Sequence, residues 1–240
     1  MYTYSKCVVN TYIFCYIESM ENIKENNPLL AVDAVLFTVM DESLKVLLIQ
    51  IEGGEYDSQW AVPGGLVLKG EKLDKAVARV LNEKANVEDV YLEQLYTFGE
   101  PNRDKRGHSV SVAYYALIDH PEKLDVKTME YYQNIKWFDI DELPKMAFDH
   151  KMIIQYAHER LKAKLTYTNI AYSLLPEKFT LPQLREVYEV IYGEDLDKRN
   201  FRKKILNRGL VEETGERQED VSHRPAKLYR FSKKSLEIFD

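Results

Sequence analysis

The sequence has little cysteine, no long apolar run, and few of the residues that mark fibrous or disordered chains. Its two cysteines, Cys7 and Cys15, cannot hold a chain of 240 residues together by disulfides. No run of about 18 apolar residues occurs, so the sequence predicts no membrane-spanning helix. Ten glycines and eight prolines exclude a collagen-like or low-complexity chain. Because 45% of the residues are hydrophobic, we expect a folded globular protein of one large or two modest domains.

Charge is distributed unevenly along the chain. The net charge of −6, taken alone, disfavours a nucleic-acid-binding protein. Residues 1–165 hold 26 acidic and 19 basic residues, whereas residues 166–240 hold 13 acidic and 14 basic ones. Within the second part, residues 198–208 and 224–234 are basic and contain no acidic residue. Because exposed charges are screened over roughly 10 Å at about 0.1 M salt, such basic surfaces act locally despite the negative total.

The first residues differ in character from the rest. Residues 1–19 are rich in aromatic residues and lack the apolar stretch and the small-residue cleavage site of a signal peptide. We expect Met20 to be the physiological start and residues 1–28 to form a leader or loose tail. Since no targeting segment is recognisable, we expect a cytoplasmic protein.

Residues 29–165 have the pattern of an α+β domain. Apolar runs predict strands over 29–40, 45–52, 60–67, 90–100, 108–119 and 135–143. Helical spacing of apolar residues predicts one helix near 73–84 and another over 150–165. Strands, a helix, more strands and a closing helix are typical of a sandwich of helices and sheet.

Residues 166–240 have the pattern of a winged helix-turn-helix domain. Thr180 and Gln183 form a capping box before a first helix. Asp197 is a suitable N-cap for a second helix, and Gly209 a suitable residue to end it. Two short strands are expected next, over 210–216 and 227–232. Helix, turn, helix and hairpin follow the order of a winged helix.

The second helix has one apolar side and one basic side. At about 100° per residue, Phe201 and Ile205 define the buried side. On the opposite side, arginine can read guanine, asparagine can read adenine, and lysine can contact phosphates. Basic hairpin residues would form a wing along the DNA backbone or minor groove. The predicted DNA-binding residues are Arg199, Asn200, Arg202, Lys203, Lys204, Asn207, Arg224, Lys227 and Arg230.

Two other interpretations of these basic residues are open. A single basic run is more often a solvated surface. Some winged helices, in addition, bind proteins. Two basic elements in the order of a winged helix favour DNA, and a steep dependence of binding on salt would separate the DNA-binding interpretation from the protein-binding one.

Residues 29–165 contain a separate sequence motif. Gly65, Glu71, Arg79 and Glu83 match the frame G-x5-E-x7-R-E-U-x-E-E-x-G-U, in which U is aliphatic. The frame follows the string WAVPGG at residues 60–65. This segment resembles the Nudix box. The resemblance implies a Nudix α/β/α sandwich with a mixed sheet, followed here by the C-terminal winged helix-turn-helix domain.

The departures from the Nudix box bear on catalysis. In active Nudix hydrolases three carboxylates on the box helix bind a divalent metal, which offsets phosphate charge and activates water. Here the three positions are Val80, Glu83 and Lys84, and the box glycine is Asn86. Valine offers no ligand and an ammonium repels a cation. We therefore expect no catalytic residue and no metal or other cofactor. The alternative is a metal-dependent pyrophosphohydrolase acting on ADP-ribose or another nucleoside diphosphate derivative, which would need Mg²⁺.

A decayed site can still bind a ligand. Glu71 and Arg79 are expected to pair across the turn, and Lys84 to meet a ligand phosphate as a point charge. The loop at 101–108 is either an exposed hairpin loop or a rim for an anionic ligand. The predicted ligand-binding residues are Glu71, Arg79, Glu83, Lys84, Arg103, Arg106 and His108. For His150 and His158 we expect only structural or surface roles.

Two longer strings extend the resemblance. RDKRGHSVSVAYYAL at 103–117 and DKRNFRKKILNRGLVEETGE at 197–216 closely resemble segments of the Nudix-related transcriptional regulators known as the NrtR family. The resemblance covers residues 29–232. It implies a homodimeric bacterial repressor. Its Nudix half would sense ADP-ribose or a related nucleotide or sugar, and its winged helix would bind a palindromic operator in double-stranded DNA.

Overall fold

The computed structural model describes most of the chain after the expected leader. The described residues are 27–119, 121, 132–219, 225–233 and 235–239. The expectations for residues 1–26, including Met20, and for Arg224 lie outside the described residues. In the part of the chain that the structure describes, no helix combines the length and the apolar composition of a membrane-spanning segment.

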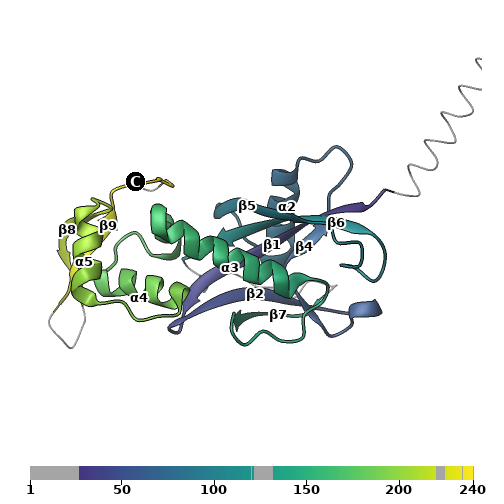
Figure 1. Ribbon diagram of the computed structural model, residues 1–240, viewed down its shortest axis with the longest axis horizontal. Helices are drawn as coiled ribbons and strands as arrows, with labels where there is room; N and C mark the ends of the chain where they lie inside the picture. Colours follow the sequence, from purple (N-terminus) through teal and green to yellow (C-terminus); the bar gives the residue numbers. More distant parts are fainter. Residues whose placement is uncertain (1–26, 120, 122–131, 220–224, 234, 240) are drawn as a thin grey trace, which may run out of the picture.

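A mixed sheet forms the centre of the first half (Figure 1). Its strands are β1 (Leu29–Met40), β2 (Ser43–Ile51), β3 (Trp60–Ala61), β4 (Gly64–Leu66), β5 (Tyr91–Phe98), β6 (Ser109–Leu117) and β7 (Tyr132–Asp139). The main order is β3-β2-β1-β6-β5, with β4 beside β1 and β7 beside β2. β1 and β6 are parallel, and the other pairs are antiparallel. Loops join this sheet to the short 3₁₀ helix η1 (Gly54–Tyr56).

Two helices cover opposite faces of this sheet. α2 (Leu73–Ala85) packs on one face and α3 (His150–Tyr167) on the other. Because side chains alternate along a strand, Ala34 and Leu36 of β1 join the α2 side of the core, whereas Val35 and Phe37 join the α3 side. This arrangement confirms the predicted α/β/α sandwich with a mixed sheet.

The second half is the predicted winged helix. Its elements are the 3₁₀ helix η3 (Ile170–Leu174), α4 (Leu181–Tyr192), α5 (Lys198–Asn207), β8 (Val211–Arg217) and β9 (Lys227–Phe231). The Thr180–Gln183 capping box is formed, and the Asp197 side chain accepts a hydrogen bond from the Asn200 amide at 2.8 Å. Gly209 ends the second helix with a φ of 64°, a conformation that glycine adopts without strain.

The two halves share one hydrophobic core. Leu161 and Leu165 of α3 lie in the same buried cluster as Leu184 and Ile191 of α4. His158 Nε2 also lies 2.8 Å from the Ile191 carbonyl oxygen. The boundary expected at residue 165 therefore falls within the last turn of α3, and the helix continues from the sheet into the winged helix (Figure 1).

A buried ion-pair network joins β1, the 101–108 loop and the start of α3. The Arg103 guanidinium donates to Asp149 at 2.7 and 2.9 Å and to Asp33 at 3.2 Å. It also donates to the Ser109 hydroxyl at 3.2 Å. The Arg103 and Asp33 side chains are only 4% and 7% exposed. Buried charges need such partners, because each would otherwise lose its hydration without compensation.

His150 and Ser111 complete the surroundings of Asp33. Ser111 donates to Asp33 at 2.5 Å, and His150 Nε2 lies 3.5 Å from the same carboxylate. His150 Nδ1 accepts the Val62 amide proton at 3.1 Å, which leaves the Nε2 proton directed at Asp33. Burial alone would raise the pKa of Asp33, but His150, the Ser111 hydrogen bond and the charge of Arg103 together lower it to about 2.

Removal of the arginine should destabilise the fold strongly. In Arg103→Met, Asp33 remains buried without its cation, so we expect the free energy of unfolding to fall by about 3–5 kcal/mol, measured by urea denaturation. The matched control is Lys105→Met in the same loop, whose exposed pair with Glu55 should contribute less than about 1 kcal/mol. A loss below about 1 kcal/mol in Arg103→Met would contradict the role given to the network.

Acid should weaken the fold through Asp33. Its pKa is lower in the folded chain than its ordinary value of 3.8, so the stabilisation is present above that value and is lost as pH falls towards about 2. We expect a loss on the order of 2 kcal/mol between pH 5 and pH 2 in urea unfolding of the wild type. The Asp33→Asn variant cannot ionise at this position and should show a correspondingly smaller loss. The same pH dependence in both proteins would show that Asp33 does not contribute it.

Candidate functional site

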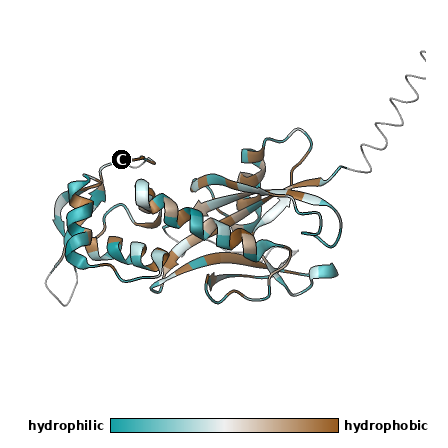
Figure 2. Ribbon diagram, in the orientation of Figure 1, coloured by the Kyte–Doolittle hydropathy of each residue, from teal (hydrophilic) through white to brown (hydrophobic). Residues whose placement is uncertain are grey.

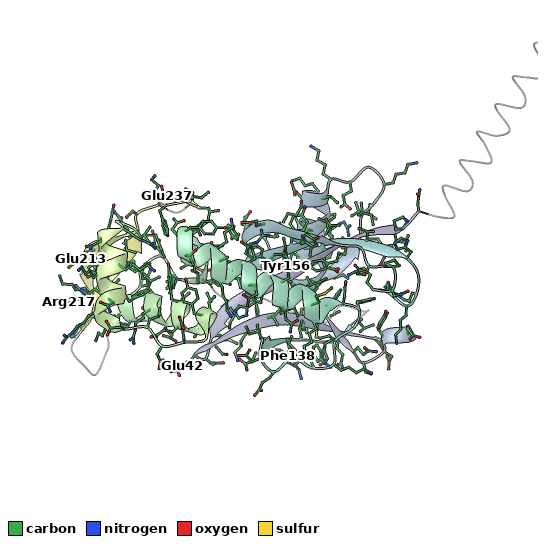
Figure 3. All side chains as sticks on the ribbon, in the orientation of Figure 1. Glu42, Phe138, Tyr156, Glu213, Arg217 and Glu237 are labelled. Atoms are coloured by element: carbon green, nitrogen blue, oxygen red, sulfur yellow. The ribbon has the colours of Figure 1, made fainter. Side chains whose placement is uncertain are left out.

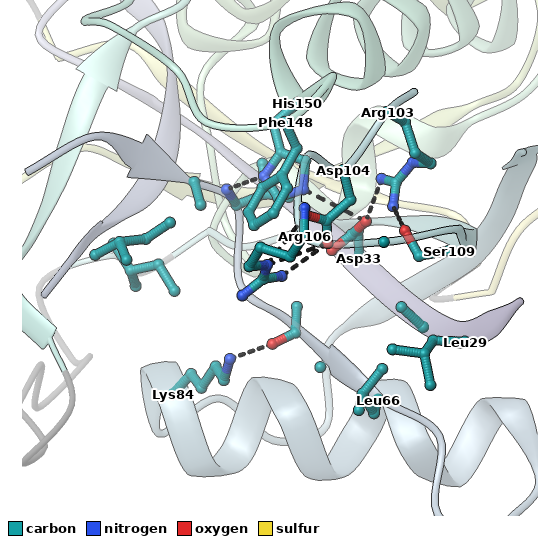
Figure 4. Close-up of a pocket in the computed structure, with 18 residues that line it drawn as sticks. Leu29, Asp33, Leu66, Lys84, Arg103, Asp104, Arg106, Ser109, Phe148 and His150 are labelled. Atoms are coloured by element: carbon teal, nitrogen blue, oxygen red, sulfur yellow. Dashed lines mark hydrogen bonds and ion pairs between the residues drawn. The ribbon is translucent and has the colours of Figure 1, made fainter. Parts of the chain in front are cut away.

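A cavity of about 420 Å³ opens beside this network (Figure 4). Its volume lies in the range of small-molecule sites. Part of the wall is apolar and is formed by Leu29, Ile49, Ile51, Leu66 and Phe148. The charged and polar part is formed by Asp33, Lys84, Arg103, Asp104, Arg106 and His150. The cavity thus offers an apolar surface and several cationic groups to one ligand.

Arg106 is held at the cavity by a carboxylate and two aromatic rings. Its Nη2 donates to Asp104 at 2.9 Å. Its guanidinium carbon lies 5.0 Å from the centre of the Phe148 ring and 5.6 Å from that of Tyr56. The two rings pack at a centroid distance of 4.2 Å. Stacking on aromatic faces leaves the edge of a guanidinium able to donate hydrogen bonds to an anion.

Lys84 reaches the cavity from α2. Its ammonium donates to the Gly64 carbonyl oxygen, as Figure 4 shows. Burial lowers the pKa of Lys84 to about 8, and the nearby carboxylates of Asp33 and Glu83 limit this decrease. A Cβ atom on Gly64 would lie 2.0 Å from Asp33 Oδ1, so only glycine fits between β1 and the lysine. These residues form a closely packed corner of the cavity.

The other residues of the Nudix box form a separate network. Arg79 donates to Glu71 at 2.8 and 2.9 Å and to Glu83 at 3.1 Å. Glu71 also accepts the Leu68 amide at 2.9 Å, and these hydrogen bonds, the largest effect coming from Arg79, lower its pKa to about 2. Glu71, Arg79 and Glu83 are not in the wall of the cavity, whereas Gly65 is. The expected pairing across the turn is present and fixes the loop against α2.

The helix positions that bind metal in active Nudix hydrolases do not offer a metal site here. Val80 is fully buried in the core, Glu83 is paired with Arg79, and Lys84 brings a positive charge. In the part of the chain that the structure describes, no group of three or more His, Cys, Asp or Glu side chains could hold a metal ion. The donor set therefore does not fit the divalent cation that this fold would imply.

The loop residues predicted as a rim have different positions. Arg106 lies in the cavity wall, as the rim interpretation expects. Arg103 also reaches the wall, but it is buried in the ion-pair network instead of being exposed on a rim. His108 is exposed and lies outside the wall, and its carbonyl accepts the Leu29 amide at 3.0 Å.

The sequence did not identify several residues of the cavity, among them Asp33, His150 and Phe148. Asp33 gave a usable signal, because a single acid within the apolar run of residues 29–40 must find a buried partner. His150, for which the sequence predicts a structural or surface role, is 3% exposed within the network around Asp33 and also lies in the wall. Phe148 has a φ of 53° in an irregular segment, and no periodic pattern could have identified it.

A second candidate surface is the outer face of α5, which is strongly hydrophilic in Figure 2. Phe201 and Ile205 are buried as expected, and the Phe201 ring packs 5.2 Å from that of Tyr188. The predicted DNA-binding residues of this helix are all exposed: Arg199, Asn200, Arg202, Lys203, Lys204 and Asn207. Within the described residues, Arg199, Arg202 and Lys203 pair with no carboxylate, which leaves their charge available to phosphates.

In the wing, which is formed by β8 and β9, the predicted DNA-binding residues Lys227 and Arg230 each form an ion pair with a glutamate. Lys227 of β9 lies 2.8 Å from Glu213 of β8, which Figure 3 shows at the winged-helix end of the molecule. Arg230 lies 3.3 Å from Glu212. These exposed pairs are weak, so both cations can exchange a carboxylate for a phosphate at little cost.

Comparison with known proteins agrees with both halves. Residues 29–157 match the model of the NUDIX domain, and residues 171–231 match that of the NrtR DNA-binding winged helix domain. The chain is 38% identical over 210 residues to the ADPR responsive transcriptional repressor NtrR of Acinetobacter baylyi, covering 86% of this chain and 83% of the relative.

Solved structures show the same similarity. Shewanella oneidensis NrtR complexed with a 27mer DNA is 38% identical and has a TM-score of 0.74, covering 85% of this chain and 93% of that one. The NUDIX domain of the same protein, complexed with ADP ribose, is 37% identical with a TM-score of 0.51, covering 59% and 97%. The chain thus combines a Nudix fold without the metal-binding set and a winged helix with an exposed basic face, and it belongs to the NrtR family of Nudix-related transcriptional regulators.

Proposed function

We propose that this protein is a ligand-responsive transcriptional repressor in the cytoplasm. The winged helix binds operator DNA, and the cavity of the Nudix half binds ADP-ribose or a closely related nucleotide. The observation that carries the proposal is the exposed basic face of α5, joined through one hydrophobic core to a cavity that has cations but no metal-binding set.

The chemistry of the cavity suits ADP-ribose. A diphosphate needs several hydrogen-bond donors with positive charge, and Lys84 and Arg106 supply them. A purine needs an apolar or aromatic surface, and Phe148, Ile49 and Ile51 supply one. The relative from Acinetobacter baylyi is named as responsive to this nucleotide, and the NUDIX domain of Shewanella oneidensis NrtR is complexed with it.

The DNA-bound form is proposed to be a homodimer. Each subunit would place α5 in the major groove of one half-site, with the half-sites about one helical turn apart. ADP-ribose lowers operator affinity only if it binds more tightly to a state in which the two winged helices do not match that spacing. Repression would then end when the nucleotide accumulates.

Two residues of α5 provide the test of DNA binding. Arg199→Ala combined with Lys203→Ala should weaken operator binding by at least about tenfold and reduce its salt dependence, because a base contact and a phosphate contact are removed. Fluorescence anisotropy on DNA from upstream of the protein's own gene cluster measures both effects.

The matched control removes the same charge from α3. Lys151→Ala combined with Lys162→Ala should leave operator affinity unchanged within about twofold, because these residues lie in the other half of the molecule. Unchanged operator affinity in the α5 variant would show that this helix does not contact the operator bases. No salt-dependent DNA binding by the wild type would favour a protein-binding winged helix instead.

The effector should bind without being consumed. We expect ADP-ribose to release operator DNA. We also expect no AMP or ribose phosphate to form in the presence of Mg²⁺ at high protein concentration, because the box helix keeps only one of the three carboxylates that bind the metal. Anisotropy and chromatography of the nucleotide measure the two outcomes. Mg²⁺-dependent turnover that Glu83→Gln abolishes would contradict the proposal and identify a pyrophosphohydrolase.

A further inference from the structure

One of the three metal-binding positions of the Nudix box helix is a lysine here, Lys84. Lys84 Nζ and the Gly64 carbonyl oxygen are hydrogen-bonded at the wall of the cavity, with the Asp33 carboxylate close by. Carbonyl and carboxylate oxygens are the donors that a hard divalent cation prefers. At this place the two kinds of oxygen atom lie beside a cationic side chain.

Lys84 follows a part of α2 that packs closely on β4. Val80, one turn earlier on α2, is fully buried in the core on the α2 side of the sheet. Its Cγ2 would lie 3.1 Å from a Cβ on Gly65, so the helix and the strand are in close contact. This close contact of α2 with β4 places Lys84 within reach of the Gly64 carbonyl oxygen, to which its ammonium donates.

The two arginines of the cavity are less suited to this role. Arg103 uses its guanidinium for Asp33, Asp149 and Ser109, and these bonds hold the fold together. Arg106 is bound to Asp104 through Nε and Nη2. An ammonium is compact and has three N–H donors, so Lys84 can hold the Gly64 carbonyl and a phosphate oxygen at the same time.

We propose that the Lys84 ammonium replaces the divalent cation in this cavity, so that a nucleoside diphosphate binds without metal and a metal cannot enter. The inference rests on the proposed effector site. An ammonium neutralises phosphate charge but does not lower the pKa of water as a divalent cation does. The same side chain therefore retains the ligand and prevents its hydrolysis, which a sensor of that ligand requires.

Isothermal titration of the full chain with ADP-ribose tests the inference in two buffers, one with EDTA and one with Mg²⁺. The wild type should bind with the same Kd in both, within about twofold. Lys84→Met should bind at least about tenfold more weakly in both buffers, which is the loss of one charge-assisted phosphate contact. Lys84→Glu should be weaker still in EDTA and should recover at least about fivefold in Mg²⁺, because it returns a carboxylate to the helix.

The controls are the same substitutions at Lys75, which is exposed on α2 and lies outside the wall. Lys75→Met and Lys75→Glu should bind as the wild type does in both buffers. The urea midpoints of all variants show whether each is folded. A folded Lys84→Met that binds within about twofold of the wild type would overturn the inference, as would wild-type affinity that drops about fivefold or more in EDTA.

The operator assay distinguishes failure of the inference from failure of the proposed function. Metal-free binding of ADP-ribose that does not change operator affinity would retain the inference and remove ADP-ribose as the effector. Release of the operator only in Mg²⁺ would retain the effector and overturn the inference. No binding in either buffer would overturn both.

Discussion

The burial of a negative charge at Asp33 is the constraint on which much of the first half depends. Asp33 lies on β1 between β6 and β4, and its side chain is only 7% exposed. Its cation must come from elsewhere, and Arg103 brings the 101–108 loop to β1. Asp149, which shares this arginine, brings the start of α3 to the same point. The ion pairs around the Asp33 carboxylate thus hold together β1, the 101–108 loop and the start of α3, which are far apart in the sequence.

The cavity results from the same contacts. Its wall takes Asp33, Arg103 and His150 from the network, and Gly64 lies directly against Asp33. The stability of the fold and the shape of the site are therefore not separable at this point. Lys84 and Arg106 reach the cavity without making the ion pairs of the network. Substitutions at these two positions can therefore change ligand binding with less effect on the stability of the fold.

Much of the fold could be predicted from the sequence because its local signals are strong. The apolar run of β1, the Thr180–Gln183 capping box and the spacing of Phe201 and Ile205 each depend on neighbouring residues only. The parallel pairing of β1 with β6 could not be predicted, since alternation of side chains gives neither the partner nor the direction of a strand.

The site was predicted in part for the same reason. Lys84 and Arg106 carry charge at positions that a motif or a loop made visible, and both reach the cavity. Phe148 and His150 belong to the site only through tertiary structure. Arg103 looked like a member of an exposed basic loop, because the acids that bury it, Asp33 and Asp149, are 70 and 46 residues away in the sequence.

The continuous core between the halves limits how such a protein can be assembled from parts in evolution or in the laboratory. Leu161 and Leu165 bury their side chains with residues of α4. Backbone hydrogen bonds of 2.7 and 2.9 Å between Phe179 and Tyr229 also join β9 to the segment that precedes α4. A foreign DNA-reading module joined after α3 would have to cover those leucines with equivalent apolar side chains. Changes of operator preference are therefore easier to obtain by altering the exposed residues of α5 than by exchanging the whole module.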